Sequence, residues 1–391
     1  MATRIATVAA RRAKDRARAR GFGLSGWLIA ATCALLLLGL IMILSASSVS
    51  SFATYGSSFL FFKKQLMWAA VGLVAFFAFA HLDYRRLRGV SFLFLAAAVA
   101  LLVAVLVPGV GVSSGGSARW LGLGPVSFQP SEFTKLALLL FAADVFARKR
   151  ERSFRESSHT LLPMIPVIGV LGVLVVMQPD LGTALLLGAI GIGMLFVAGA
   201  PVRYVAPIAI SGAALALIAA MAEPYRRARI FAFLNPWADP LNSGYQTIQS
   251  LIALGSGGWF GVGLGASRQK WSYIPNAHTD FIFAILGEEM GLFGTLIVVG
   301  MFVFIAYLGI RTARRAPDRF GTLVAAGITI WISIQALVNI GAVTSSLPIT
   351  GIPLPFVSFG GSSLVVSLIA MGILVSIARR GKDGAASRAK G

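Results

Sequence analysis

Residues 27–47 read WLIAATCALLLLGLIMILSAS, a run of 21 positions with no charged side chain. An α-helix needs about 20 apolar residues to cross the hydrocarbon core of a bilayer, so this run predicts a membrane-spanning helix. Nine further apolar runs follow, with boundaries uncertain by a few residues. The predicted spans are 27–47, 65–81, 90–107, 131–147, 162–177, 181–200, 203–221, 280–308, 321–342 and 359–378.

The composition also indicates a membrane protein. Hydrophobic residues make up 57% of the 391 positions and charged residues only 12%, which exceeds what a soluble core can hide. The runs are continuous rather than alternating, which argues against a β-barrel and predicts an all-α polytopic fold. The formal charge of +20 does not indicate nucleic acid, because no basic patch is interleaved with aromatics that could stack on bases.

The distribution of lysine and arginine predicts the orientation. Ten spans place both termini on one side, and 25 of the 34 lysines and arginines fall on that side. Because cytoplasmic loops are enriched in these residues, we expect both termini to be cytoplasmic. The chain then divides into a basic tail (1–26), a ten-helix membrane domain (27–378) and a second basic tail (379–391). A large extracytoplasmic loop (222–279) lies between helices 7 and 8.

Two other features bear on compartment. The first apolar run is longer than the core of a signal peptide and is followed by further spans, so we expect it to be retained. Cys33 is the single cysteine of the chain, which excludes an internal disulfide framework and a thiol metal site.

Nine cations fall on the outer side, against the general bias. Lys63 and Lys64 follow two phenylalanines and can reach lipid headgroups from the start of a helix. For the others a shared anionic ligand is the better account, because the large loop also holds glycine, proline and aromatic residues that shape a surface. These seven are Arg119, Lys135, Arg226, Arg227, Arg229, Arg268 and Lys270.

The large loop is expected to be structured. Asn235-Pro236 and Asp239-Pro240 each pair a capping residue with a proline suited to a first helical turn. Apolar residues recur at helical spacing over 245–254, which predicts an amphipathic helix at the outer interface. The glycine-rich run 255–265 would let backbone amides approach a ligand, although this signal alone is weak.

Three acids lie at or near the start of the eighth span. Asp280 directly precedes an apolar run, where burial would raise its pKa and arginines or the helix dipole would lower it. It is either a helix cap or a functional group. Glu288 and Glu289 lie two turns deeper, and they either form polar contacts inside the bundle or serve the function.

Polar residues also gather at the outer ends of other spans. Glu132 and Lys135 are three positions apart, so they share a helix face and can neutralise one another. Asp180 can cap the sixth helix or pair with an arginine of the loop. The final hairpin (344–363) ends in hydroxyls and amides at a helix start, which suit phosphate. Its candidate ligands are Ser358 and Ser362.

Five motifs stand in order along the chain: Phe128-Gln-Pro-Ser-Glu-Phe-Thr-Lys135, Gln178-Pro-Asp-Leu-Gly-Thr183, Asn235-Pro-Trp-Ala-Asp-Pro240 with Ser243-Gly-Tyr-Gln246, His278-Thr-Asp-Phe-Ile-Phe-Ala284 with Gly287-Glu-Glu289, and Pro355-Phe-Val-Ser-Phe-Gly-Gly-Ser-Ser363. Together they resemble the shape, elongation, division and sporulation (SEDS) family, ten-helix polymerases of peptidoglycan. The resemblance covers nearly the whole chain. The FtsW-like cell-division branch is the most similar part of the family, with the sporulation paralogue as the main rival. This similarity rests on the sequence Pro236-Trp-Ala-Asp-Pro240, on Gln269-Lys270 and on the long basic N-terminus.

This resemblance implies glycosyl transfer on the outer face of the bacterial cytoplasmic membrane. Lipid II units, carried on undecaprenyl pyrophosphate, would be joined into glycan strands with inversion at the anomeric carbon. The resemblance implies that Asp280 is the base for the acceptor 4-hydroxyl, and this chemistry requires positive charge near the departing phosphates. The residues expected to bind or support the substrate are Arg119, Trp120, Glu132, Lys135, Arg226, Arg227, Arg229, Lys270, His278, Ser358 and Ser362.

Cofactor and partners are expectations of the same kind. Pyrophosphate chemistry suggests a divalent cation, Mg²⁺ or Mn²⁺, although the sequence shows no dedicated metal-ligand cluster, and we expect no organic cofactor. The resemblance implies an FtsI-like class B penicillin-binding transpeptidase, docked near the eighth and ninth spans, and other membrane proteins of the division site.

The main alternative function is a lipid II flippase. A transporter should carry ionisable groups near the midplane and broken helices in both halves, whereas here the polar groups cluster at the outer mouth. An elongation or sporulation paralogue of the same polymerase is a further alternative. A scaffold role would coexist with catalysis.

Overall fold

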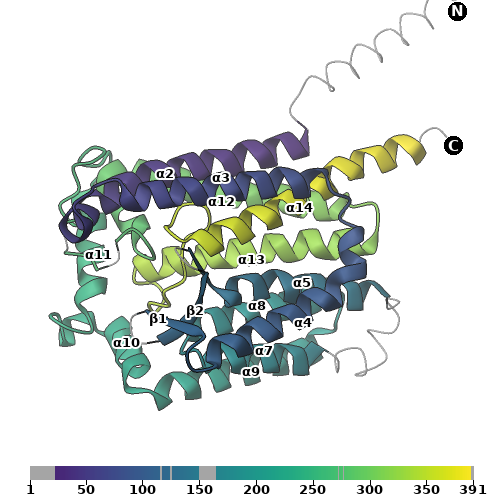
Figure 1. Ribbon diagram of the computed structural model, residues 1–391, viewed down its shortest axis with the longest axis horizontal. Helices are drawn as coiled ribbons and strands as arrows, with labels where there is room; N and C mark the ends of the chain where they lie inside the picture. The colour runs from purple at the N-terminus through teal and green to yellow at the C-terminus, as the bar shows by residue number, and fades with distance from the viewer. Residues whose placement is uncertain are drawn as a thin grey trace, which may run out of the picture.

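The computed structural model describes residues 23–114, 117–123, 126–148, 164–271, 273–275 and 277–388 (Figure 1). The predicted N-terminal tail therefore lies outside the described residues up to position 22. The cations predicted in the inner loop at 149–160 and the last three positions of the C-terminal tail also lie outside them.

Each of the ten predicted spans overlaps one helix of the described chain. Seven of these helices are long and apolar enough to cross a membrane by length and composition, and α7 and α8 are shorter apolar helices. The remaining one, α5, carries four charged residues. The helices are α2 (Leu24–Tyr55), α3 (Leu60–His81), α4 (Arg86–Leu106), α5 (Pro130–Arg148), α7 (Met164–Val176), α8 (Leu181–Val197), α9 (Val202–Ala222), α12 (Ile282–Arg314), α13 (Arg319–Val343) and α14 (Gly361–Arg388).

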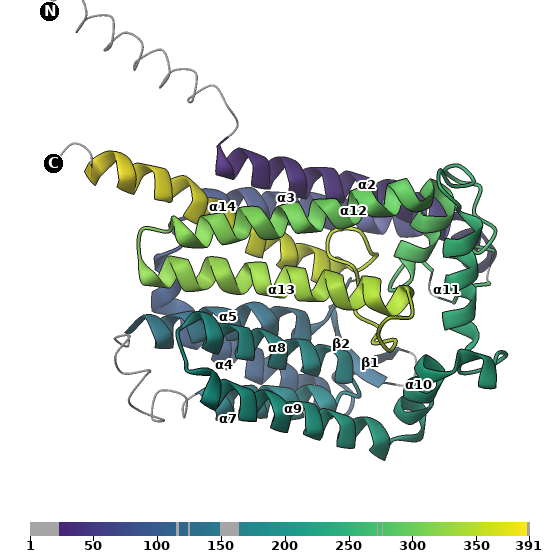
Figure 2. The ribbon, with the colours of Figure 1, turned by 180° about the vertical axis from the view of Figure 1, so that it is seen from behind.

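The helices lie side by side in two groups with α13 between them (Figure 2). One group contains α2, α3, α12 and α14, and the other contains α4, α5, α7, α8 and α9. Both described termini, Gly23 and Arg388, lie at the same end of the bundle, here called the inner end (Figure 1). The opposite, outer end carries the large loop and a small sheet. Because α13 contacts both groups, its polar side chains can join segments from each.

The all-α prediction is wrong for one segment. Between α4 and α5 the chain forms a three-stranded antiparallel sheet in the order β1–β2–β3. Its strands are only three to seven residues long and contain glycine and serine, so periodicity cannot separate them from a loop. In the register, Trp120 pairs with Val112 and Leu121 with Phe128. The strands are β1 (Gly111–Ser114), β2 (Ser117–Leu123) and β3 (Val126–Phe128).

The segment between α9 and α12 folds into short helices and turns. It contains α10 (Pro224–Leu234), the 3-10 helix η2 (Pro236–Ala238) and α11 (Tyr245–Ser256). A proline stands in the first turn of α10 and of η2, because the missing N–H is unpaired there anyway. The predicted amphipathic helix is present as α11, which buries Ile248 and exposes Ile252.

The final hairpin, residues 344–360, turns back into the bundle. Backbone groups away from water must find partners within the protein, and α13 supplies them. The Gln335 amide donates to the Pro353 carbonyl at 2.9 Å, and the Asn339 amide donates to the Ile352 carbonyl at 2.8 Å. Two polar side chains inside a spanning helix therefore hold the hairpin in place.

The glycine-rich run lies against a break in α12. Gly291 interrupts this helix with a φ of 66°, a left-handed conformation that favours glycine. The Val262 N–H donates to the Glu288 carbonyl at 2.9 Å, and the Leu292 N–H donates to the Gly258 carbonyl at 2.9 Å. The expectation that this run offers its amides to a ligand is therefore wrong for these groups, because they satisfy the broken helix.

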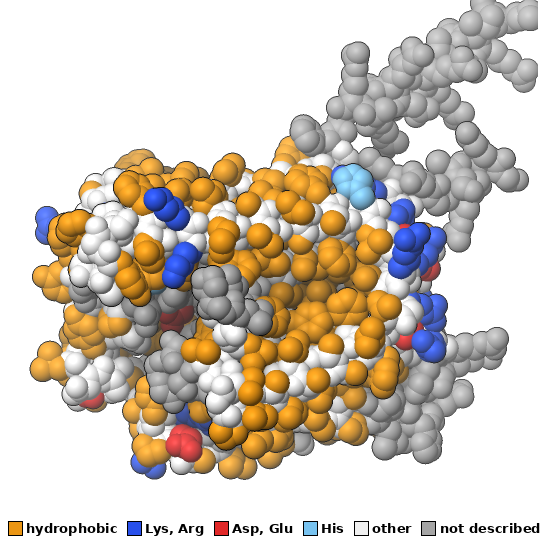
Figure 3. All heavy atoms as spheres, viewed as in Figure 1, with side chains coloured by type: hydrophobic (Ala, Val, Ile, Leu, Met, Phe, Trp, Pro, Cys, Tyr) orange, Lys and Arg blue, Asp and Glu red, His pale blue; other side chains and the backbone are white. Residues whose placement is uncertain are grey.

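Charged side chains gather toward the two ends of a largely hydrophobic face (Figure 3). At the inner end, Asp318 precedes α13 and accepts hydrogen bonds from the Gly321 N–H at 2.8 Å, the Tyr84 hydroxyl at 2.6 Å and the Arg85 guanidinium at 2.9 Å. One carboxylate thus caps α13 and ties it to the turn between α3 and α4.

We expect Asp318→Ala to lower the unfolding free energy by about 1–3 kcal/mol, because the cap and two further hydrogen bonds are lost together. Asp318→Asn keeps an acceptor for the Gly321 N–H and should lose less. Thermal unfolding in detergent measures both. The control is Asp83→Asn, which loses a partly exposed contact with Arg380 at 3.4 Å but keeps an acceptor for the Arg85 N–H, and it should matter by less than about 1 kcal/mol. Equal midpoints for Asp318→Ala and wild type would contradict the prediction.

Candidate active site

Two cavities meet at the outer end, between the sheet, the large loop and the final hairpin. The first, of about 490 Å³, is lined by Arg119, Arg226 and Arg229 among others, and we call it the cation cavity. The second, of about 310 Å³, we call the aromatic cavity. Asp280 and Gly351 line both cavities. The aromatic side chains of the second cavity are Phe61, Trp68, Trp120 and Phe359.

Strand β2 contributes a residue to each of the two cavities. Successive side chains of a strand point to opposite faces, and Arg119 lines the cation cavity while its neighbour Trp120 lines the aromatic cavity. The sheet that was not predicted therefore gives these two predicted residues different surroundings.

The three arginines of the cation cavity are held by backbone carbonyls. Arg119 donates to the carbonyls of Gln178 at 3.0 Å and Pro179 at 2.6 Å. Arg226 and Arg229 come from α10, and Arg229 donates to the Ile349 carbonyl at 3.4 Å. Within the described ranges, none of the three forms an ion pair with a carboxylate. Their charge is thus available to an anion that enters the cavity.

Asp280 lies between the two cavities, just before α12. It does not cap this helix, because the N-cap position belongs to Phe281. Its carboxylate accepts a hydrogen bond from the Thr279 hydroxyl at 2.8 Å. Burial raises the pKa of the Asp280 carboxyl above its ordinary value, while the Thr279 hydrogen bond and the charge of Arg229 act to lower it. A carboxylate with a raised pKa is the better proton acceptor.

Two residues near Asp280 have only weak sequence signals. Asn339 donates to the carbonyl of Asp280 at 2.8 Å and to that of Ile352 at 2.8 Å. An amide within an apolar span is the signal that could have found it. Lys64, expected to reach lipid headgroups, lines the aromatic cavity. The sequence signal that could have found Lys64 is its position among the nine cations on the outer side.

Seven of the eleven predicted substrate ligands line neither cavity, and His278, Ser358 and Ser362 are three of these. The His278 ring packs against Phe61 with centroids 4.7 Å apart, and burial lowers the pKa of His278 to about 4, so the imidazole is neutral at neutral pH. Ser358 Oγ accepts from the Leu354 N–H at 2.8 Å, and Ser362 Oγ accepts from the Gln129 N–H at 3.1 Å. These three side chains therefore pack behind the cavity walls and do not face the interior of either cavity.

Glu132 and Lys135 form the predicted pair. The Lys135 Nζ lies 2.8 Å from the Glu132 carboxylate, and the two side chains are 1% and 3% exposed. The Lys135 Nζ also donates to the Gln335 side chain at 3.0 Å and lies 5.1 Å from the Trp331 ring centroid. Neither residue of the pair lines a cavity, so in this structure the pair joins α5 to α13.

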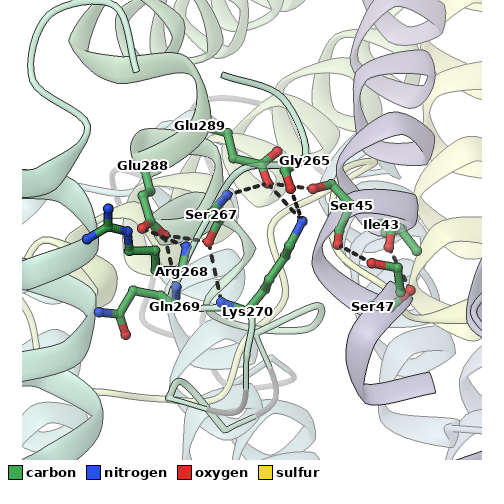
Figure 4. A network of polar contacts seen from close by, with 11 residues as sticks. Ile43, Ser45, Ser47, Gly265, Ser267, Arg268, Gln269, Lys270, Glu288 and Glu289 are labelled. Carbon is green, nitrogen blue, oxygen red and sulfur yellow. Dashed lines mark hydrogen bonds and ion pairs between the residues drawn. The ribbon is translucent and has the colours of Figure 1, made fainter. Parts of the chain in front are cut away.

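Lys270, expected at the pyrophosphate, lies in a buried network with α12 (Figure 4). Its Nζ is 3.8 Å from the Glu289 carboxylate. Glu289 also accepts from the Ser45 hydroxyl at 2.5 Å, and Glu288 accepts from the Arg268 N–H at 2.9 Å. Of the alternatives for Glu288 and Glu289, polar contacts inside the bundle are therefore observed. Lys270 lines neither cavity.

Two other residues that the sequence singled out do not offer a free group to the cavities: Arg227 lies outside them, and the Asp180 carboxylate binds the start of α8. Arg227 is exposed and lines neither cavity. Asp180 lines the cation cavity, but its carboxylate accepts from the Thr183 N–H at 3.0 Å and the Thr183 hydroxyl at 2.9 Å. Of its two alternatives, the structure shows the cap of α8.

The carboxylates of the cation cavity limit how it could hold a metal. The described part of the chain contains no group of three or more His, Cys, Asp or Glu side chains that could bind one. Mg²⁺ is often held by one or two carboxylates together with substrate phosphates. Since Asp180 is engaged by the start of α8, Asp280 is the carboxylate that fits such an arrangement.

We expect Lys135→Met to lower the unfolding free energy by about 3–5 kcal/mol, because it leaves Glu132 buried without a partner. The double variant Lys135→Met with Glu132→Gln removes both charges and should recover most of the loss. Unfolding midpoints in detergent measure this recovery. If both variants fold like wild type, the pair does not stabilise the bundle and a direct role at the substrate gains support.

Comparisons with known proteins match the family that the sequence motifs resemble. A family model described as "Cell cycle protein", FTSW_RODA_SPOVE, matches residues 26–383. Stage V sporulation protein E of Bacillus subtilis is 44% identical over 354 residues, which cover 90% of this chain and 96% of that protein. The probable peptidoglycan glycosyltransferase FtsW of Geobacter metallireducens is 40% identical over 354 residues, covering 90% and 93%.

Solved structures are similar over the same length. A chain of a peptidoglycan synthase complex, described as coordinating polymerization and crosslinking, gives a TM-score of 0.73 at 30% identity and covers 90% of this chain and 97% of that one. The rod shape determining protein RodA of Thermus thermophilus gives 0.66 at 28% identity, covering 90% and 95%. On the extent of these matches, the chain belongs to the FTSW_RODA_SPOVE family.

Proposed function

We propose that this protein is a peptidoglycan glycan-strand polymerase, which joins lipid II units by inverting glycosyl transfer. The observation that carries the proposal is the position of Asp280, a carboxylate with a raised pKa between a cavity lined by three arginines, which are held by backbone carbonyls, and a cavity of aromatic rings. FtsW relatives are named as peptidoglycan glycosyltransferases, which supports this activity.

The cation cavity suits the donor. Its arginines would bind the pyrophosphate, and the Thr350 hydroxyl, which is buried and has no hydrogen-bond partner among the described residues, adds a donor in the same wall. The cavity is apolar where it meets α8 and α9, through residues such as Leu185 and Leu217. Since α9 is largely exposed, a polyprenyl chain could lie along it in the membrane while its pyrophosphate stays beside the arginines.

The aromatic cavity suits the acceptor sugar, because Trp68 and Trp120 offer flat apolar faces and Lys64 offers a donor. In the reaction the Asp280 carboxylate accepts the proton of the acceptor 4-hydroxyl. The oxygen attacks the donor anomeric carbon from the opposite side to the pyrophosphate, the new C–O bond forms, and undecaprenyl pyrophosphate leaves with the electron pair. The arginines stabilise its developing charge.

A divalent cation bound with the pyrophosphate would supply further charge neutralisation. Asp280 is the carboxylate of this chain best placed to contact it, because Asp180 is engaged by α8. The arginines of the cation cavity provide a fixed positive charge in either case.

We infer the following topology. The ten helices cross the cytoplasmic membrane of a bacterium, both termini are cytoplasmic, and the large loop is extracytoplasmic. In support, the described termini share the inner end, where several arginines lie, and the cavities lie at the outer end. Action at the division site rests on the similarity to FtsW proteins, with the sporulation paralogue as the alternative.

We further propose that a class B penicillin-binding transpeptidase docks on α12 and α13. These helices expose Leu296, Ile297 and Leu337, and an apolar groove of about 270 Å³ lies where α12 and the end of α13 meet α11. The similar synthase complex is described as combining polymerization with crosslinking, which supports such a partner. Other division proteins would bind elsewhere on the bundle.

We expect Asp280→Asn to lower glycan polymerization by at least about a hundredfold, since the amide cannot accept the proton while the shape is kept. The chain would be purified with its cognate transpeptidase, supplied with lipid II and Mg²⁺, and its products separated on a gel. Arg227→Gln, outside the cavities, is the matched control. Wild type that moves lipid II across vesicles without polymerizing it would favour the flippase, and normal polymerization by Asp280→Asn would exclude this base.

The pH dependence of the rate should report the pKa of Asp280. A base works when deprotonated, so activity is lost as pH falls through its pKa, and burial shifts this acid limb above that of an ordinary carboxyl. Because the charge of Arg229 lowers this pKa, Arg229→Gln should move the limb to higher pH, and Arg229→Lys should move it less. An acid limb unchanged in Arg229→Gln would argue against this coupling.

A further inference from the structure

Gly351 lies in the final hairpin, where the cation cavity and the aromatic cavity adjoin. We call this junction, lined by Asp280 and Gly351, the neck. Gly351 is exposed, whereas the next residue, Ile352, is buried. A Cβ atom built on Gly351 would lie 4.0 Å from the Asp280 Oδ2 atom. A side chain here would therefore project beside the carboxylate, into the space where the cavities adjoin.

The two sides of this neck are held at a set distance. One amide, that of Asn339, donates to the carbonyls of both Asp280 and Ile352, each at 2.8 Å. On the other side of Gly351, the carbonyl of Ile349 accepts from Arg229 at 3.4 Å. The hairpin cannot move away from Asp280 without breaking these bonds, so the opening does not widen easily to admit a side chain.

We propose that Gly351 is a positioning residue of the site: its lack of a side chain keeps the neck open, so that a sugar hydroxyl in one cavity can reach both the Asp280 carboxylate and a donor carbon in the other. This inference rests on the proposed polymerase function. The hydroxyl oxygen must come within about 2.6–3.2 Å of the carboxylate to transfer its proton. A methyl group in contact with that carboxylate would occupy part of the approach.

Backbone strain is the competing explanation for any loss of activity, since Gly351 has a φ of 73°. The chain offers a matched control in Gly56, which has a φ of 71° and, among the described residues, no neighbouring atom within 4 Å of a Cβ built on it. Gly56→Ala places a Cβ atom at a similar positive φ without filling a cavity. Gly351→Asn separates the effects further, because asparagine tolerates a positive φ better than alanine but is larger.

The test compares wild type, Gly351→Ala, Gly351→Asn and Gly56→Ala, each purified with the transpeptidase. Polymerization of lipid II gives kcat and KM, and thermal unfolding checks that each variant is folded. We expect kcat to fall about tenfold in Gly351→Ala and at least about a hundredfold in Gly351→Asn, with KM for lipid II within about threefold of wild type. Gly56→Ala should match wild type.

The possible results separate the two claims. If wild type makes no polymer, the proposed function fails and this inference falls with it. If wild type polymerizes but Gly351→Asn is as active as Gly351→Ala or more so, strain is the cause and the neck is not limiting. An equal loss in Gly56→Ala, or normal rates in both Gly351 variants, would overturn the inference as well. Should Gly351→Asn not fold, the contrast between Gly351→Ala and Gly56→Ala still decides it.

Discussion

The candidate site depends on two hydrogen bonds from one side chain. The Asn339 amide donates to the carbonyls of Asp280 and Ile352, and so joins the segment that precedes α12 to the hairpin that precedes α14. Asp280 presents its carboxylate to both cavities, and Gly351 forms the opposite side of the neck. Together with the hydrogen bond from the Phe359 N–H to the His278 carbonyl at 2.9 Å, these bonds fix two loops far apart in sequence relative to one another, and so define the cavity walls beside the carboxylate.

The same constraint explains other unusual features of the structure. Backbone groups in a membrane-embedded bundle cannot rely on water, so each departure from helix needs partners within the protein. Gln335 and Asn339 supply them for the final hairpin. The glycine-rich run supplies them for the break of α12 at Gly291. Polar side chains and glycines in this chain therefore have two roles. Some shape the cavities, and others provide hydrogen-bond partners or conformations that irregular backbone needs inside the bundle.

This division accounts for which site predictions agreed with the geometry. Arg119, Arg226 and Arg229 come together in one cavity, and Trp120 lines the other. Lys135 and Lys270 are paired with buried acids instead. Residue type and topology indicate that an outward cation needs an anion, but they do not say whether the anion is a ligand or a neighbouring carboxylate. The Glu132–Lys135 spacing favoured pairing from the start, whereas Lys270 and Glu289 are brought together by the glycine-rich turn.

The sequence by itself determined that the chain is built from apolar helices and where along the chain they lie, because a continuous apolar run of sufficient length has few alternatives to a helix in a membrane. It also singled out Asp280, through its position before such a run and through a family resemblance. Only the tertiary structure decided that neighbouring residues of β2 line different cavities, that Asn339 joins two loops, and that Gly351 lies beside Asp280. The physical reason is that these features arise from contacts between distant segments, which local hydrophobicity and spacing do not encode.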